Sequence, residues 1–249
     1  MLVLKKRKLF LKLEEVYYAQ DHATYKTNAD IVLFYQCVKS QEVCHNKNTL
    51  HIDLSKDEEA LFSDLHEHTR RELMRARNDS NKYIFNENPT MEQFIEFCDF
   101  YNVFASTKGI TSIDPVSYKL LLENNSFIIT KMLDNEDKVL CYHTYIVDGH
   151  RARTQHSCSQ FRNSEDKNYR ALVGRANREL HWKDMMTFKE KEFSIYDFGG
   201  LALNDDPVMK NIDKFKMSFG GKIVTEYEFY QPRSFLGKLM LKITKKDVS

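Results

Sequence analysis

The residues best suited to chemistry lie around two Phe-Gly-Gly triplets, at residues 198–200 and 219–221, which hold four of the chain's eight glycines. Asp197 ends the predicted strand SIYDF directly before the first triplet, and Lys216 precedes the second triplet in FKMSFGG. Glycines at a strand end let a ligand approach the backbone. Asp197 is therefore a candidate to orient an amine or accept its proton, and Lys216 a candidate to stabilise an oxyanion. The alternatives are that the two triplets are ordinary turns and that Asp197 and Lys216 form structural salt bridges.

A second group of candidates lies in SQFRNSEDKNYRALVGRAN, where a strand leads into a long predicted helix. The free N–H groups of a helix N-terminus bind pyrophosphate well, and small residues in the first turns allow close approach. A glycine inside a helix can equally mark tight packing. The candidates for binding a phosphorylated cofactor are Asn168, Tyr169, Arg170, Gly174 and Arg175.

A row of cations lies on an earlier predicted helix, in HEHTRRELMRAR. His66, Arg70 and Arg77 fall on one side of that helix, at the rim of its apolar stripe. Arg binds phosphate in a bidentate manner, so Arg70 and Arg71 are candidates for a phosphate-bearing substrate, together with Gly199 and Gly200. A solvated face paired with neighbouring glutamates is the alternative.

Histidines are the natural candidates for a general base near neutral pH, and the sequence offers His143, His150, His156 and His181 around the strands and the long helix. His156 is the one we include among the catalytic candidates, although a hydrogen-bonded structural role suits any of the four. The sequence has no Gly-x-Ser-x-Gly elbow, no P-loop and no dinucleotide-binding fingerprint. The five cysteines are widely spaced and lack zinc-ligand spacing, so we expect reduced thiols and no metal site.

The composition is that of an ordinary globular protein, with 42% hydrophobic and 29% charged residues in 249. A net charge of +1 gives no overall field for nucleic acid, so DNA is not expected as a partner and tRNA is disfavoured. Lys and Arg interrupt the apolar residues of the N-terminus, and no uncharged stretch approaches a membrane span of about 20 residues. We therefore expect a cytoplasmic chain.

The predicted elements that position these residues form an α+β arrangement. The first 50 residues mix short strands with polar connections. Helices follow, with Ser55 and Glu58 as a predicted capping box, then Pro89 to Gly109, and then a helix capped by Asp114. The second half alternates strands and helices, with Asp148-Gly149 as a hairpin turn, which indicates a sheet with helices on its faces.

Four segments in order, LHIDLSKDEEALFSDLHEHTRRELMRARND, GRANRELHW, YDFGG and FKMSFGG, resemble the Fem-type branch of the GNAT acyltransferases, which includes the peptidoglycan-bridge aminoacyltransferases. The resemblance covers about residues 50–229. It implies a mixed, twisted sheet whose central strands splay to admit the donor's pantetheine arm. It also implies attack of a substrate amine on a thioester or an aminoacyl ester. On this basis we expect a reduced GNAT-like lobe at residues 1–125, packed closely on a GNAT-like lobe at 126–249.

The function that the resemblance implies is transfer of an acyl group, with acetyl-CoA or another acyl-CoA as donor, to the amine of a nucleotide-linked amino sugar in cell-surface polysaccharide synthesis. Aminoacyl-tRNA is the alternative donor. A non-catalytic binding module is the other alternative, because the glycine after Arg170 comes one residue later than in the usual GNAT phosphate loop. The tail RSFLGKLMLKITKKDVS is either a helix packed on the domain or a peripheral membrane contact.

Overall fold

The structure, a computed structural model, describes residues 1–159 and 165–244. It consists of two compact units whose segments interleave along the sequence. The first unit comprises Met1–Leu50, Gly200–Lys210 and Ile223–Ser249, and the second comprises His51–Gly199 and Asn211–Lys222. The first unit therefore draws on stretches from both ends of the chain.

The first unit is built on four strands in the order β1-β2-β3-β10. β1 and β2 form an antiparallel hairpin, β2 and β3 are parallel, and β3 and β10 are antiparallel. The bounds are β1 Leu2–Lys8, β2 Leu11–Tyr17, β3 Ile31–Cys37 and β10 Lys222–Pro232, with β4 at His45–Asp53 and helix α7 at Phe235–Thr244. Its core consists of Val16, Ala19, Ala29, Val32, Phe34, Cys37 and Phe229.

The second unit is built on five strands in the order β9-β8-β7-β6-β5. β5 to β8 are antiparallel to their neighbours, whereas β8 and β9 are parallel. The strands are β5 Lys82–Asn86, β6 Phe127–Leu133, β7 Val139–Val147, β8 Arg151–Ser159 and β9 Ile195–Leu201. The helices are α1 Glu58–Asp64, α2 Glu67–Ala76, α3 Met91–Lys108, η1 Pro115–Tyr118, α4 Lys119–Glu123, α5 Lys167–Glu190 and α6 Pro207–Met217. The α+β prediction is confirmed.

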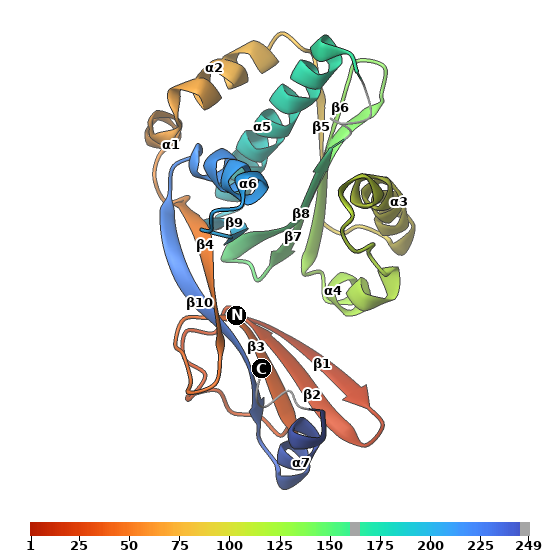
Figure 1. Ribbon diagram of the computed structural model, residues 1–249, viewed down its shortest axis with the longest axis vertical. Helices are drawn as coiled ribbons and strands as arrows, with labels where there is room; N and C mark the ends of the chain where they lie inside the picture. Colours follow the sequence, from red (N-terminus) through yellow and green to blue (C-terminus); the bar gives the residue numbers. More distant parts are fainter. Residues whose placement is uncertain (160–164, 245–249) are drawn as a thin grey trace. The chain divides into compact units, whose positions relative to one another are not determined.

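Helices cover both faces of this second sheet: α5 lies on one face and α3 on the opposite one (Figure 1). The apolar side of α5 packs on β6 and β7 through a cluster of fully buried side chains. That cluster consists of Met132, Leu140, Cys141, Val173, Ala176 and Leu180. This packing fixes the middle of α5 on the sheet.

The helix predicted to start at the Ser55 capping box differs from the structure. The N-cap is Asp57, whose carboxylate accepts the Ala60 N–H at 2.7 Å, and the helix stops at Leu65 before His66 caps α2. Asp is as good an N-cap as Ser, and two residues in extended or turn conformation end the first helix. The apolar stripe that we predicted is still buried, because α2 continues it with Thr69, Leu73 and Ala76.

The other predicted boundaries are confirmed. Thr90 and Gln93 form a capping box at the start of α3, and Gly109 ends that helix in the left-handed conformation at φ 64°. The Asp114 side chain caps η1 by accepting the Val116 N–H. Gly149, with φ 82°, makes the predicted turn between β7 and β8.

All five cysteines are free thiols, and four of them are buried. Burial raises the pKa of Cys37 and Cys158, and it raises the pKa of Cys98 to about 11. In the described ranges no helix combines the length and apolar character needed to span a bilayer.

Candidate active site at the end of the β8–β9 ladder

The parallel ladder between β8 and β9 is short. It joins Arg151, Ala152 and Arg153 to Ile195, Tyr196 and Asp197, although β8 continues to Ser159 and β9 to Leu201. On the other side of β8, Thr144 and Tyr145 of β7 pair with His156 and Thr154, which leaves Gln155 as an extra residue. A bulge of this kind bends its strand and increases the local twist. We call the region at and just beyond the last β8–β9 pair, residues 153–156 and 197–199, the fork.

Asp197 lies at the fork with its carboxylate fully buried. Arg151 donates to it from Nε at 3.1 Å and also from a terminal guanidinium nitrogen, and the Arg153 Nε lies 3.3 Å away. The N–H of Gly199 donates to the other carboxylate oxygen at 2.8 Å. A buried carboxylate with this many donors holds them in place, so Asp197 organises the cations around it.

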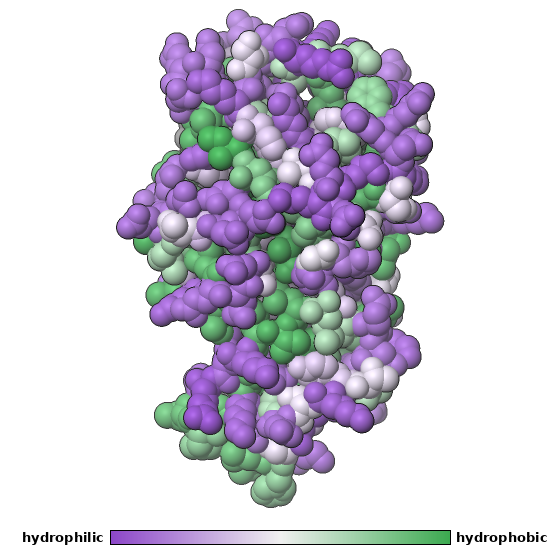
Figure 2. Space-filling model, turned by 180° about the vertical axis from the view of Figure 1, so that it is seen from behind, coloured by the Kyte–Doolittle hydropathy of each residue, from purple (hydrophilic) through white to green (hydrophobic). Residues whose placement is uncertain are grey.

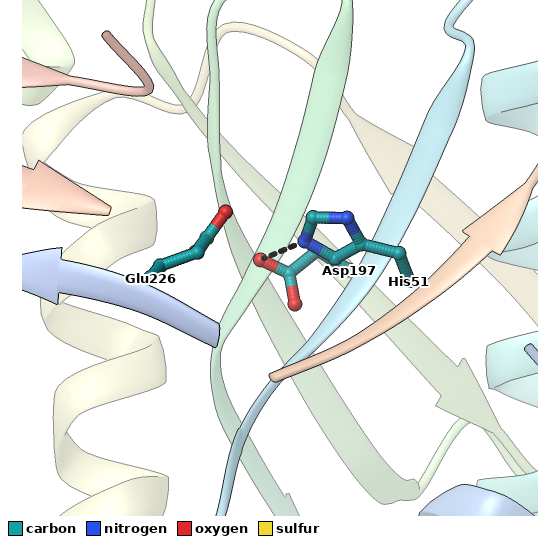
Figure 3. Close-up of side chains that lie close together, drawn as sticks. All are labelled: His51, Asp197 and Glu226. Carbon is teal, nitrogen blue, oxygen red and sulfur yellow. Dashed lines mark ion pairs between the residues drawn. The ribbon is translucent and has the colours of Figure 1, made fainter. Parts of the chain in front are cut away.

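His51 of β4 completes the group, because its Nε2 lies 3.8 Å from the Asp197 carboxylate (Figure 3). Glu226, also drawn there, belongs to the first unit. Burial lowers the pKa of His51 to about 4, against the attraction of Asp197 and with the help of the two arginines. His51 is therefore a neutral imidazole at neutral pH.

Lys216 of α6 belongs to the same electrostatic group. Burial lowers the pKa of its ammonium, the nearby Arg153 guanidinium lowers it further, and Asp197 acts in the opposite direction. Arg151, Arg153 and Lys216 are thus the cations near the Asp197 carboxylate, and Asp213 is a second carboxylate that acts on Lys216. Cations gathered at one point suit a phosphate or a developing oxyanion.

His156 lies just beyond the bulge, and its Nε2 is 2.7 Å from the Tyr118 hydroxyl. That hydroxyl also accepts a hydrogen bond from the Gln155 amide at 3.1 Å. Burial, followed by the charge of Arg153, lowers the pKa of His156 to about 4. The imidazole is therefore neutral at neutral pH, and a pKa this low makes it a weak base.

A network of buried hydroxyls lies behind the fork, on the α5 side of the sheet. The Tyr196 hydroxyl is 2.8 Å from that of Tyr145 and 2.7 Å from His181 Nδ1, and Tyr145 donates to Asp184 at 2.5 Å. His143 is also bound to Asp184, at 2.9 Å. His143 and His181, two of the four candidate histidines, are therefore buried and hydrogen-bonded, as in the structural alternative to a general base. Such networks fix the orientation of the strands that carry them.

The two Phe-Gly-Gly triplets meet through their aromatic rings. The ring centroids of Phe198 and Phe219 are 4.9 Å apart, and His181 packs on both. Gly199 has φ +73°, and a Cβ there would come within 2.9 Å of the Thr154 carbonyl oxygen. Gly200 has open space around the position of a Cβ. The first triplet therefore holds β9 against β8 at Gly199 only.

The candidates at the start of α5 have different surroundings. Asp166 caps the helix by accepting the Asn168 N–H at 2.8 Å, and the Tyr169 ring carries the Lys138 ammonium at 4.7 Å from its centroid. The Gly174 carbonyl accepts from Arg178, and Arg175 makes a bidentate pair with Asp79 at 2.6 and 2.8 Å. The loop before Asp166 includes residues 160–164, which lie outside the described residues.

The basic candidates of α2 make local contacts. Arg70 donates to the Ser63 carbonyl at 2.8 Å, and exposed Arg71 lies 3.1 Å from His68 Nδ1. The structure thus brings Asp197, Lys216, Gly199 and His156 to one place. The candidates of α2 and the start of α5 lie on other elements.

Arg153 is the residue that sequence reasoning missed. It lies beside Asp197, donates to the Gln155 side chain at 3.4 Å, and contributes to the pKa shifts of both Lys216 and His156. The signal was present in HRARTQH, because two arginines at i and i+2 of a strand project from one face. Without knowing which strand lies next to β8, that face could not be assigned to Asp197.

Comparison of the structure with solved ones supports the fold. The crystal structure of FemX aligns with a TM-score of 0.65 at 10% identity, covering 97% of this chain and 85% of that one. The C-terminal domain of a protein described as a lysylphosphatidylglycerol synthetase, from Agrobacterium fabrum, aligns at 0.54 and 10% identity, with 97% and 84% covered. L-PGS from Bacillus licheniformis aligns at 0.52 and 11% identity, with 87% and 73% covered.

No known family model and no curated protein matches the sequence. The recognition therefore depends on the structure, in which a mixed, twisted sheet with helices on both faces includes a parallel strand pair that parts at the fork. The chain has the Fem-type, GNAT-like fold that its sequence motifs predict.

Proposed function

We propose that this chain is a transferase that moves an acyl or aminoacyl group from an activated ester or thioester to an amine, with the reaction at the fork. The observation that carries the proposal is the parallel ladder that ends at Arg153 and Asp197, with Lys216 adding a second cation there. Where a ladder stops and its strands continue, their backbone N–H and C=O groups need other partners, and an extended ligand is one such partner. Cations at that point suit the oxyanion of acyl transfer.

In the proposed reaction each residue of the fork has its own role. The amine nitrogen attacks the carbonyl carbon, and the carbonyl π electrons move to oxygen, where Lys216 and Arg153 stabilise the negative charge. The neutral imidazole of His156 is proposed to accept a hydrogen bond from the attacking nitrogen, and the proton that this nitrogen loses passes to solvent water. Collapse of the intermediate then breaks the bond to the sulfur or oxygen of the leaving group, which takes up a proton. Asp197 is a positioning residue, because it holds the two arginines.

The first candidate reaction uses acetyl-CoA or another acyl-CoA and the amine of a nucleotide-linked amino sugar, in cell-surface polysaccharide synthesis. Asn168, Tyr169, Arg170, Gly174 and Arg175 are then the proposed donor contacts, and Arg70 and Arg71 the proposed acceptor contacts. Purified protein mixed with acetyl-CoA and a panel of amino-sugar nucleotides should release free thiol only when an acceptor is present. Lys216→Met should reduce the rate by about 100-fold or more. An absence of thiol release across the panel would rule out this reaction.

The second candidate uses an aminoacyl ester, and one observation favours it. The Asp166 carboxylate already accepts a hydrogen bond from the Asn168 N–H at the start of α5, and Glu165 adds a second negative charge there. Both disfavour a pyrophosphate at that helix end. FemX and the lysylphosphatidylglycerol synthetases among the similar structures agree with this donor. Filter binding of aminoacyl-tRNA should then be tight and should weaken as salt rises.

A non-catalytic module remains the alternative from another class. Calorimetry would support it if neither acyl-CoA nor aminoacyl-tRNA gave any heat of binding. Turnover by the wild type that is lost in Lys216→Met would contradict it.

A further inference from the structure

The first unit has an exposed apolar surface that the transfer reaction does not use. Leu9 and Phe10 form the turn of the β1–β2 hairpin with exposed fractions of 85% and 65%, and Phe235 at the start of α7 is also 85% exposed. Leu239 and Ile243 follow Phe235 at helical spacing on the same exposed side of α7. Figure 2 shows hydrophobic side chains over α7 and the hairpin turn, with hydrophilic ones beside them.

The hairpin turn departs from the usual turn chemistry. Leu9 has φ 54°, a conformation that Asn, Asp or Gly adopts at low cost in a two-residue hairpin turn. A leucine followed by a phenylalanine at such a turn costs stability and solubility, and buries nothing within the chain. The residues present there are better suited to contact with an apolar phase than to making a turn.

Asp30 fastens the hairpin and α7 to each other. Its carboxylate accepts the Lys12 N–H at 2.9 Å and the Ser234 hydroxyl at 2.6 Å, and its backbone carbonyl accepts the Arg233 N–H at 2.8 Å. Gly237 packs over the same carbonyl so closely that a Cβ would lie 2.0 Å from the oxygen. The exposed side chains of both elements therefore belong to one surface.

Cations surround this surface. Residues 1–13 contain five Lys and Arg and no acid, and residues 233–244 contain Arg233, Lys238 and Lys242 and no acid. A groove beside the hairpin is lined by basic side chains, and Glu14, which accepts from the Tyr25 hydroxyl at 2.7 Å, is the acid in its lining. Those basic side chains are Lys5, Lys6, Arg7, Lys12 and Lys26.

We propose that the hairpin turn and α7 form a docking surface for an anionic lipid bilayer, with Leu9, Phe10, Phe235, Leu239 and Ile243 inserted among the headgroups. Apolar side chains rimmed by lysine and arginine are what an interfacial helix presents to anionic lipid. A second copy of the chain would set like charges against each other across a two-fold interface, so charge complementarity favours the lipid.

The test is cosedimentation of the full chain with phosphatidylcholine vesicles that contain or lack phosphatidylglycerol. Retention is expected only with the anionic vesicles and should fall in high salt. Lys238→Gln with Lys242→Gln should weaken binding roughly 25-fold, from about fivefold for each basic residue. The matched control is Lys119→Gln, an exposed lysine of α4 in the second unit, which should leave binding unchanged.

The apolar side chains need a separate test. Phe235→Ser with Phe10→Ser should abolish retention, whereas Val116→Ser, 75% exposed in the second unit, should not. In a Trp182→Phe background, Phe10→Trp should shift its emission to the blue on anionic vesicles, and circular dichroism shows whether each variant is folded. Equal retention of all variants, or a dimer in sedimentation velocity that Phe235→Ser abolishes without any vesicle binding, would overturn the proposal.

Discussion

Asp197 makes more charged contacts than any other residue described at the site. Replacing it should lower the stability of the fold as well as the activity. Asp197→Asn leaves two arginines short of their counter-charge, and the Arg151 side chain is only 5% exposed. Breaking a buried pair from one side costs about 3–5 kcal/mol. Urea denaturation should show this loss, whereas Glu123→Gln, which removes an exposed pair on α4, should change the free energy of unfolding by less than about 0.5 kcal/mol. Unchanged stability with lost activity would instead make Asp197 a proton acceptor.

His156 gives a pH-dependence with a defined sign. Burial lowers its pKa from 6.5 to about 4, so between these values the unfolded chain binds more protons than the folded one. Stability is then fully present above pH 6.5 and falls as the pH is lowered toward 4, by at most roughly 3 kcal/mol for this residue. His156→Gln, which keeps a partner for Tyr118, should reduce the slope of the free energy of unfolding against pH. An unchanged slope would assign the effect to His51 and His181.

At the scale of elements, Gly199 and Gly200 of β9 allow a matched comparison of two alanine substitutions. Gly199 needs a positive φ and has the Thr154 carbonyl where its Cβ would be, whereas Gly200 has open space there. Gly199→Ala should therefore destabilise the chain by about 1–3 kcal/mol and disturb the fork. Gly200→Ala should change stability by less than about 1 kcal/mol. Thermal unfolding of the two variants checks the difference, and similar melting temperatures would contradict it.

Substitutions at Arg175 of α5 and at its partner Asp79 distinguish binding of the acyl donor from a purely structural role of Arg175. Its guanidinium holds Asp79 in the turn before β5, so Arg175→Ala and Asp79→Ala should both lower stability, with a coupling of about 0.5–3 kcal/mol in a double-mutant cycle. If Arg175 also binds the donor, Arg175→Ala should raise the donor KM and Asp79→Ala should raise it less. Equal KM values for the two variants would leave Arg175 with the structural role alone.

Much of the element order could be predicted from the sequence, because caps and turns are local. Gly109 and Gly149 act within a few residues of themselves, and the structure confirms both. The cap at Asp57 was missed because Ser55 and Glu58 matched the same pattern two residues earlier. The strand neighbours could not be predicted, since pairing β8 with β9 depends on contacts more than 40 residues apart. Asp197 and Lys216 were therefore found, and Arg153 was not.

At the scale of the whole molecule, the interleaved segments predict how the chain responds to truncation. β10 pairs with β3, and Phe229 packs on Phe34 in the first core. A chain that starts at His51 would leave β10 with an open edge and half a core, so it should aggregate. Size-exclusion chromatography of residues 51–249 beside the full chain tests this. A monodisperse, cooperatively folded fragment would show that the second unit is self-sufficient.

The state of the thiols has a practical consequence for labelling. Four of the five cysteines are buried, and burial raises the pKa of each of these four, so their thiolates are scarce at neutral pH. Cys44, directly before β4, is the half-buried one among the five, all of which lie in the described part of the chain. A maleimide fluorophore should therefore attach to native protein at Cys44 alone. The unmutated chain thus carries its own single attachment point for measuring distances to a bound vesicle or ligand.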